Sequence, residues 1–217
     1  MEEIVESFIK FKMTKEIRQL LNHISSSYSK EMNLSQVFLE LLQEDLIGSS
    51  ELIAIRSTMM MNRYMALVRQ EFPAFMHSIY LYEHERQRLW NSSVADVPMV
   101  YNEYTHGLCV KNDVLNGSRI PLYIGDVLVV DHVERSEHYI CDNHRAQLLK
   151  AGIQAFCSIP LMHNGHSFGH KVMYARDKRV FSEQEVTRYR ACAHLIEKEL
   201  VSMKHALLEQ IRPGKIS

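Results

Sequence analysis

The chain has 217 residues, of which 46% are hydrophobic and 24% are charged. This length accommodates one domain plus an accessory segment, and the composition excludes a disordered chain. A formal net charge of −1 gives no basic footprint for nucleic acid. No apolar run reaches the ~20 residues that span a bilayer, and the start, Glu2-Glu3, lacks the basic region of a secretory signal. We therefore expect a cytoplasmic protein without nucleic-acid or membrane partners.

Apolar residues recur at helical spacing through residues 1 to 58, which predicts an N-terminal helical segment. An accessory bundle and a DNA-binding helix-turn-helix are the two interpretations. Acidic residues offset the basic ones between residues 14 and 45, whereas phosphate binding requires an excess of positive charge. We therefore favour the bundle. A further helix is predicted up to residue 71, where Phe72-Pro73 ends it because proline cannot donate a hydrogen bond to the preceding turn.

Two strands are predicted next, at residues 77 to 82 and 88 to 90, with a polar connection between them. Residues 101 to 125 follow as the least regular stretch, with three glycines and one proline. Such a stretch is typical of a long surface loop or of a segment that shapes a ligand pocket.

The pattern from residue 127 onward predicts strand, helix, strand, turn and strand. The apolar run at 127 to 130 is the first strand, and a helix over 138 to 150 ends at Ala151-Gly152. A strand over 153 to 161 then leads into Asn164-Gly165, a strong hairpin signal, and residues 167 to 174 return.

A long C-terminal helix is predicted from residue 182 to about residue 210. Ser182 and Glu185 have the spacing of a capping box at its start. Apolar residues then recur with the steps of a heptad: Tyr189, Ala193, Ile196, Leu200, Met203 and Leu207. We expect the first half of this helix to pack on its own sheet. From Leu200 onward we expect it to pair with another helix, which predicts a homodimer.

The motif Ala151-Gly152-Ile153-Gln154-Ala155-Phe156-Cys157-Ser158-Ile159-Pro160-Leu161, with the Asn-Gly turn, Gly169 and Phe181-Ser182-x-x-Glu185, resembles the second half of a GAF domain. Val97-Pro98-x-x-Tyr101-Asn102, Gly117-Ser118 and Val129-x-Asp131 fit the same family, in particular GAF modules of bacterial cyclic-di-GMP signalling proteins. The resemblance implies an α+β (two-layer α/β) fold, in which an antiparallel sheet is flanked by helices. It places a sensory domain at 59–205, after the N-terminal segment at 1–58, and the end of a signalling helix and tail at 206–217.

The resemblance also implies a ligand pocket between the sheet and the crossover formed by residues 101 to 150. Arg119 would pair with an anionic ligand through its planar donor fork. The candidate ligand-binding residues are Tyr104, Arg119, Asp131, His138, Cys141, His144, Cys157 and Tyr174.

The chemistry of these residues leaves alternatives. His138, Cys141 and His144 are metal-capable and spaced by three, but on a regular helix His144 turns to another side, so we expect no metal site. Cys141 resembles the cysteine of methionine-sulfoxide-reducing relatives, whose Gly-Cys-Gly element is missing here; it also lies near the usual bilin-attachment helix. Residues Asp177-Lys178 and Phe181-x-x-x-Glu185 match cyclic-nucleotide elements only in part.

No nucleophile, base and orienting group come together in a known catalytic motif. We therefore expect a sensory or regulatory protein, not an enzyme, that binds a small ligand or a partner and signals through dimeric terminal helices. The cofactor, if there is one, is unknown. The output partner would be a cyclic-di-GMP enzyme or another output protein. Two alternatives stay open: a small thiol redox enzyme acting through Cys141, and a ligand-free interaction scaffold.

Overall fold

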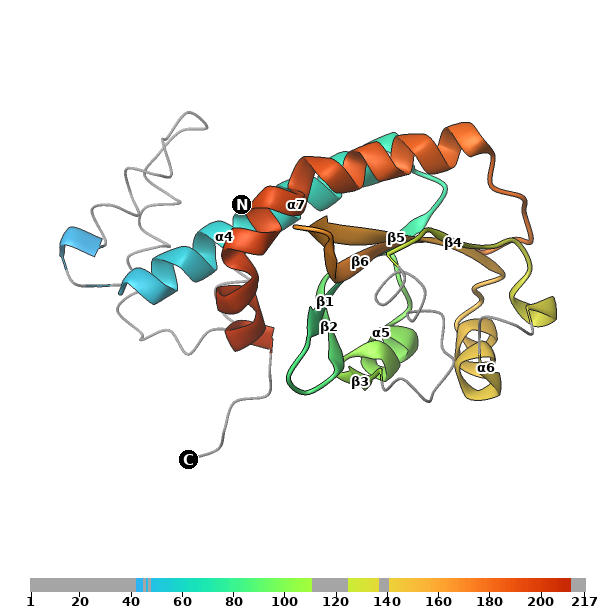
Figure 1. Cartoon of the computed structure of the whole chain (residues 1–217), viewed down its shortest axis with the longest axis horizontal. Coiled ribbons are helices and arrows are strands. Elements are labelled where there is room, and N and C mark those ends of the chain that lie inside the picture. The colour runs from blue at the N-terminus through green and yellow to red at the C-terminus, as the bar shows by residue number, and fades with distance from the viewer. Residues whose placement is uncertain (1–41, 45, 47, 111–124, 137–140, 212–217) are drawn as a thin grey trace, which may run out of the picture. The chain divides into compact units, whose positions relative to one another are not determined.

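The computed structural model (Figure 1) describes residues 42–44, 46, 48–110, 125–136 and 141–211. Most of the predicted N-terminal helical segment therefore lies outside the described residues. The chain divides into two compact units, Met1–Met61 and Asn62–Ser217. Helix α4 (Ser49–Glu71) begins in the first unit and ends in the second. The second unit contains the sheet.

A six-stranded antiparallel sheet forms the centre of the second unit, with the strand order β3-β2-β1-β6-β5-β4. This confirms the α+β class with an antiparallel sheet. The strands are β1 (Met76–Glu83), β2 (Arg88–Ala95), β3 (Leu108–Cys109), β4 (Leu128–Val130), β5 (Ala155–His163) and β6 (His166–Ala175).

Helices cover both faces of this sheet (Figure 1). Helix α7 (Glu183–Ile211) runs along one face. The end of α4 lies beside it, because the Tyr64 hydroxyl donates to the carbonyl of Cys192 at 2.7 Å and Arg188 pairs with Glu71. On the other face lie α5 (Met99–Thr105) and α6 (Asp142–Lys150). All eight residues of β1 are buried, as expected for a central strand covered on both faces.

The predicted hairpin between β5 and β6 is confirmed. Asn164 and Gly165 have φ values of 49° and 77°, the left-handed pair that a tight two-residue turn requires. Gly169 follows in β6, paired with both Leu81 and Leu161. A Cβ atom at this position would overlap the carbonyl oxygen of Tyr80, so only glycine fits there.

The predicted capping box at the start of α7 is also confirmed. The Glu185 amide donates to the Ser182 hydroxyl at 3.2 Å, and the Ser182 amide donates to the Glu185 carboxylate at 3.0 Å. The heptad residues of α7 are the buried ones in its first half, as expected. Leu200 and Leu207, however, are already buried in the single chain at 0% and 3% exposure. These two side chains are therefore already covered within the chain, and the homodimer itself stays a prediction.

Two further expectations are corrected. The stretch predicted to be irregular from residue 101 contains most of α5 and also β3; residues 111–124 lie outside the described residues. Pro98, with φ of −55°, immediately precedes α5, and its fixed φ suits a helix start. Helix α6 begins at Asp142, after the expected start at 138. No helix in the described ranges is both long and apolar enough to cross a bilayer.

Candidate functional site

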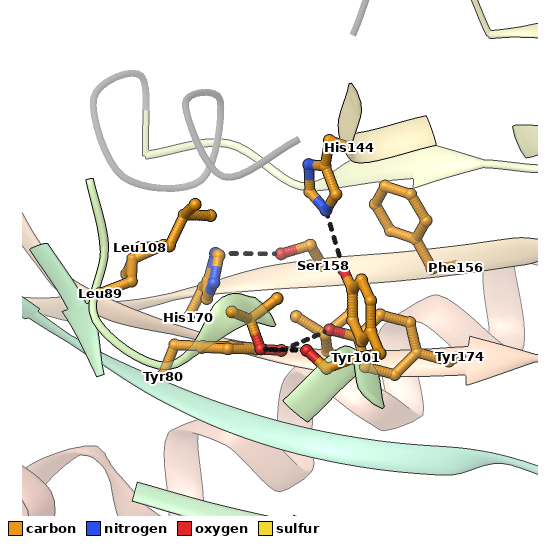
Figure 2. A pocket seen from close by; sticks show the side chains of 11 residues that line it. Tyr80, Leu89, Tyr101, Leu108, His144, Phe156, Ser158, His170 and Tyr174 are labelled. Atoms are coloured by element: carbon orange, nitrogen blue, oxygen red, sulfur yellow. Dashed lines mark hydrogen bonds between the residues drawn. The ribbon is translucent and has the colours of Figure 1, made fainter. Parts of the chain in front are cut away.

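A small cavity of about 20 Å³ lies between the sheet and helices α5 and α6 (Figure 2). This is room for about one water molecule. Strands β1, β2, β3, β5 and β6 contribute to its wall together with the two helices. The lining residues are Tyr80, Leu89, Tyr101, Thr105, Leu108, His144, Phe156, Ser158, His170, Val172 and Tyr174.

The alternation of side chains in β6 explains which residues line the cavity. Successive residues of a strand point to opposite faces of a sheet. His170, Val172 and Tyr174 therefore line the cavity, while Lys171 and Met173 point to the face that carries α7. Strand β6 thus contacts the cavity and the α7 side of the sheet through neighbouring residues.

A chain of hydroxyl groups crosses one side of the cavity. The Thr105 hydroxyl donates to the carbonyl of Tyr101 at 2.9 Å, and the Tyr80 hydroxyl donates to Thr105 at 3.3 Å. The hydroxyls of Tyr80 and Tyr174 are 2.9 Å apart. Because the Tyr80 proton is used toward Thr105, Tyr174 is the donor in that pair. Burial raises the pKa of both Tyr80 and Tyr174, so these hydroxyls stay protonated.

His144 closes the cavity from α6. Its Nε2 lies 2.8 Å from the Tyr101 hydroxyl, and the two rings stack with centroids 6.0 Å apart. Figure 2 shows this hydrogen bond as a dashed line between His144 and Tyr101. Nδ1 is buried and has no hydrogen-bond partner among the described residues. Burial lowers the pKa of His144 to about 4, so the ring is neutral at pH 7. The site therefore retains one buried ring nitrogen that a ligand or water could satisfy.

His170 lies on the floor of the cavity. Its Nδ1 is 3.4 Å from the Ser158 hydroxyl, and its ring meets the Tyr80 ring edge-on at 4.9 Å. Burial lowers the pKa of His170 to about 3, with a smaller effect from His144 in the same direction. Both histidines are thus neutral, and no aspartate, glutamate, lysine or arginine among the described residues lines the cavity. The described wall is largely apolar and carries a few uncharged polar groups.

The structure brings together some of the residues predicted from the sequence. His144 and Tyr174 line the cavity, and the half-buried Tyr104 lies beside them with its ring 5.9 Å from that of His144. Cys141 is the residue immediately before α6 and is half-buried. Arg119 and His138 lie outside the described residues.

Two predicted residues lie elsewhere. Cys157 was expected to reach the pocket, but its neighbours Phe156 and Ser158 line it, and Cys157 points to the α7 face. Burial raises the pKa of its thiol to about 12. Asp131 is not among the lining residues either: its carboxylate accepts a hydrogen bond from the amide of Phe181 at 3.3 Å, just before α7.

Sequence reasoning missed several lining residues, among them Tyr80, Tyr101 and His170. His170 could have been found, because it lies four residues before Tyr174 in a predicted strand and therefore shares its face. Tyr101 and Thr105 lie on a helix that the sequence pattern did not predict. Among the described residues, no three His, Cys, Asp or Glu side chains are placed to hold a metal ion.

Comparison with known proteins supplies a family. The family model described as GAF domain matches residues 58–200. A domain of a protein described as a two-component sensor histidine kinase from Sinorhizobium meliloti 1021 superposes with a TM-score of 0.56 at 14% identity, over 68% of this chain and 92% of that one. The GAF domain/HD domain protein from Geobacter sulfurreducens gives a TM-score of 0.54 at 14% identity, over 66% and 91%. No curated protein matches the chain.

Proposed function

Because the chain belongs to the GAF domain family, we propose that it is a sensory or regulatory protein that binds a small ligand in the cavity and signals through helix α7. The observation that carries this proposal is the double role of β6. His170, Val172 and Tyr174 line the cavity, whereas the residues between them face α7. A shift of β6 on ligand binding would therefore also displace the residues of β6 that face α7.

The lining indicates the chemistry of the ligand. Its polar groups are hydroxyls and neutral imidazoles, which can both donate and accept hydrogen bonds. A charged ligand would lose its hydration without gaining an opposite charge from the described wall. We infer a small uncharged polar ligand, and a ligand larger than a water molecule would require the wall of the cavity to move.

Signalling would involve a second protein or a second copy of the chain. The structural neighbours include domains of a sensor histidine kinase and of a protein with an HD domain, which supports an output partner in bacterial signal transduction. The proposed homodimer needs a surface other than the buried seam of α7. Leu195 on α7 and Leu67 near the end of α4 are 77% and 64% exposed, and they supply apolar area for such a contact.

Native mass spectrometry of the protein purified from cells tests the ligand. We expect a non-covalent adduct that is retained by Cys157→Ala, because Cys157 faces away from the cavity, and lost in Ser158→Leu, which fills it. If the protein carries no adduct, and if cell extract does not change its stability, the ligand proposal is overturned in favour of a scaffold.

The same spectra report the oligomeric state of the protein. A monomer at every concentration would exclude the dimer, and Leu195→Glu should weaken the dimer.

A further inference from the structure

Lys171 is buried in the face of the sheet that lies opposite the cavity. Its side chain is fully buried, at 0% exposure, between β6 and the helices α4 and α7. The amine lies 3.8 Å from the ring centroid of Tyr189 on α7 and 5.1 Å from that of Tyr64 on α4. Two aromatic rings therefore cover this amine where a lysine normally reaches solvent.

The amine lacks the partners that a buried ammonium needs. Nζ has no hydrogen-bond partner among the described residues, and no described carboxylate forms an ion pair with it. The titratable groups near it, from every element packed around it, are Tyr64 on α4, Tyr189 and Cys192 on α7, His77 on β1 and Cys157 on β5.

These neighbours offer little compensating negative charge. Burial raises the pKa of Tyr64 and Tyr189 and of the Cys157 thiol, and it lowers the pKa of His77 to about 4. Tyr64, Tyr189, Cys157 and His77 are therefore neutral near pH 7. The Tyr64 hydroxyl is engaged with the carbonyl of Cys192. The ring faces attract a cation, but they offset only part of the cost of removing an ammonium from water.

We propose that Lys171 is a proton-responsive contact of helix α7: when its amine gains a proton, the packing of α7 against the sheet weakens, and when the proton leaves, the packing is restored. Burial lowers the pKa of Lys171 from its ordinary 10.5 to about 7, which supports this assignment. Lys171 lies on β6 between His170 and Val172, which line the cavity. Protonation of Lys171 and binding of a ligand would therefore act on the same strand. The response to protonation does not depend on a ligand.

The direction of the pH effect follows from proton linkage. When α7 opens and Lys171 meets water, its pKa returns toward 10.5, so the opened form binds more protons between pH 7 and 10.5. Opening therefore becomes easier as the pH falls through this range. His77 adds to the effect only below its ordinary pKa of 6.5, and Cys157 acts only near and above 9. The window from pH 7 to 8.5 isolates Lys171.

Hydrogen exchange of α7 amides in this window tests the proposal. In the wild type, the protection factor of these amides (the exchange rate of an unstructured chain divided by the observed rate) should fall about tenfold from pH 8.5 to pH 7, as expected for one linked proton. Lys171→Met should remove this dependence. Lys198→Met, an exposed lysine on the same helix, should keep it. An unchanged pH dependence in Lys171→Met would overturn the proposal.

A second measurement avoids any substitution, in case Lys171→Met does not fold. Carbon-13 labelling of lysine side chains allows each Cε signal of the wild type to be followed by NMR from pH 6 to pH 11. One lysine should titrate about 3.5 pH units below the exposed ones, since its pKa is lowered from 10.5 to about 7. If every lysine titrates near 10.5 while the protein stays folded, the proposal fails. Neither measurement involves the cavity, so failure here leaves the proposed ligand function standing.

Discussion

The hydroxyl of Tyr101 on α5 lies 2.8 Å from Nε2 of His144 on α6, and this pair joins the two helices that cover the cavity. Tyr101→Phe removes the hydroxyl and leaves a buried imidazole nitrogen unsatisfied. We expect the free energy of unfolding, measured with urea, to fall by about 1–3 kcal/mol. Tyr104→Phe is the matched control, since Tyr104 is only half-buried, and it should change stability by less than about 0.5 kcal/mol. Equal effects of the two variants would contradict this role for the pair.

Three buried histidines should make the domain sensitive to acid. Burial lowers the pKa of His77 and His144 to about 4 and that of His170 to about 3, below the ordinary 6.5. Because the unfolded chain binds protons first, the free energy of unfolding should fall as the pH drops from 6.5 to about 4, with uptake of up to three protons on unfolding. Urea unfolding at several pH values measures this slope. A flat profile between pH 6.5 and 4.5 would contradict burial of the neutral rings.

Gly169→Ala should be severely destabilising. The added methyl group would overlap the backbone of Tyr80, which cannot move without breaking the β1–β6 pairing. We expect a loss of at least about 2–3 kcal/mol, or failure to fold. Gly165→Ala is the control, because its Cβ meets no other atom within 4 Å, although φ is 77°. That variant should cost only about 1–2 kcal/mol of left-handed strain. Circular dichroism during thermal unfolding would compare the two.

Ser182→Ala should weaken the start of α7. It removes the hydroxyl that accepts the Glu185 amide, so we expect a loss of about 1 kcal/mol in unfolding free energy. Ser202→Ala removes an exposed hydroxyl that bonds to the Glu199 carbonyl in the middle of the same helix, and it should have almost no effect. If the two alanine variants have the same stability, the capping box contributes nothing measurable.

The Cys157 thiol should resist labelling in the native protein. It is fully buried, and burial raises its pKa to about 12, so little thiolate forms. Cys109, Cys141 and Cys192 are half-buried and serve as internal controls. With a disulfide reagent at pH 8, followed by mass spectrometry of peptides, those three should react first and Cys157 only on unfolding. Early reaction of Cys157 would show that the α7 face opens readily.

Much of the fold could be predicted because its signals are local. The Asn164-Gly165 turn needs two left-handed residues, and Ser182 with Glu185 makes a capping box without any distant contact. Helix α5 gave no such signal. It is only seven residues long, and its two buried positions, Tyr101 and Thr105, are buried only because the helix packs on the sheet.

The candidate site could be predicted only in part, for a related reason. Tyr174 and His144 were found because their segments were assigned correctly. Cys157 was misplaced because a strand buried on both faces shows no polar alternation that would reveal which side faces the cavity. The hydroxyl chain of Tyr80, Tyr174 and Thr105 joins residues far apart in the sequence, and no spacing rule anticipates it.

If the cavity binds a ligand as proposed, the burial of β6 on both faces restricts how the specificity for that ligand can change. Nine of the ten residues of β6 are buried; His170, Val172 and Tyr174 line the cavity, and Lys171 contacts Tyr189 of α7. A substitution there would alter recognition and output together. Under the proposed function, new specificities would therefore arise more readily through the side chains of α5 and α6, which cover the cavity from outside and lie off the strand proposed to carry the response.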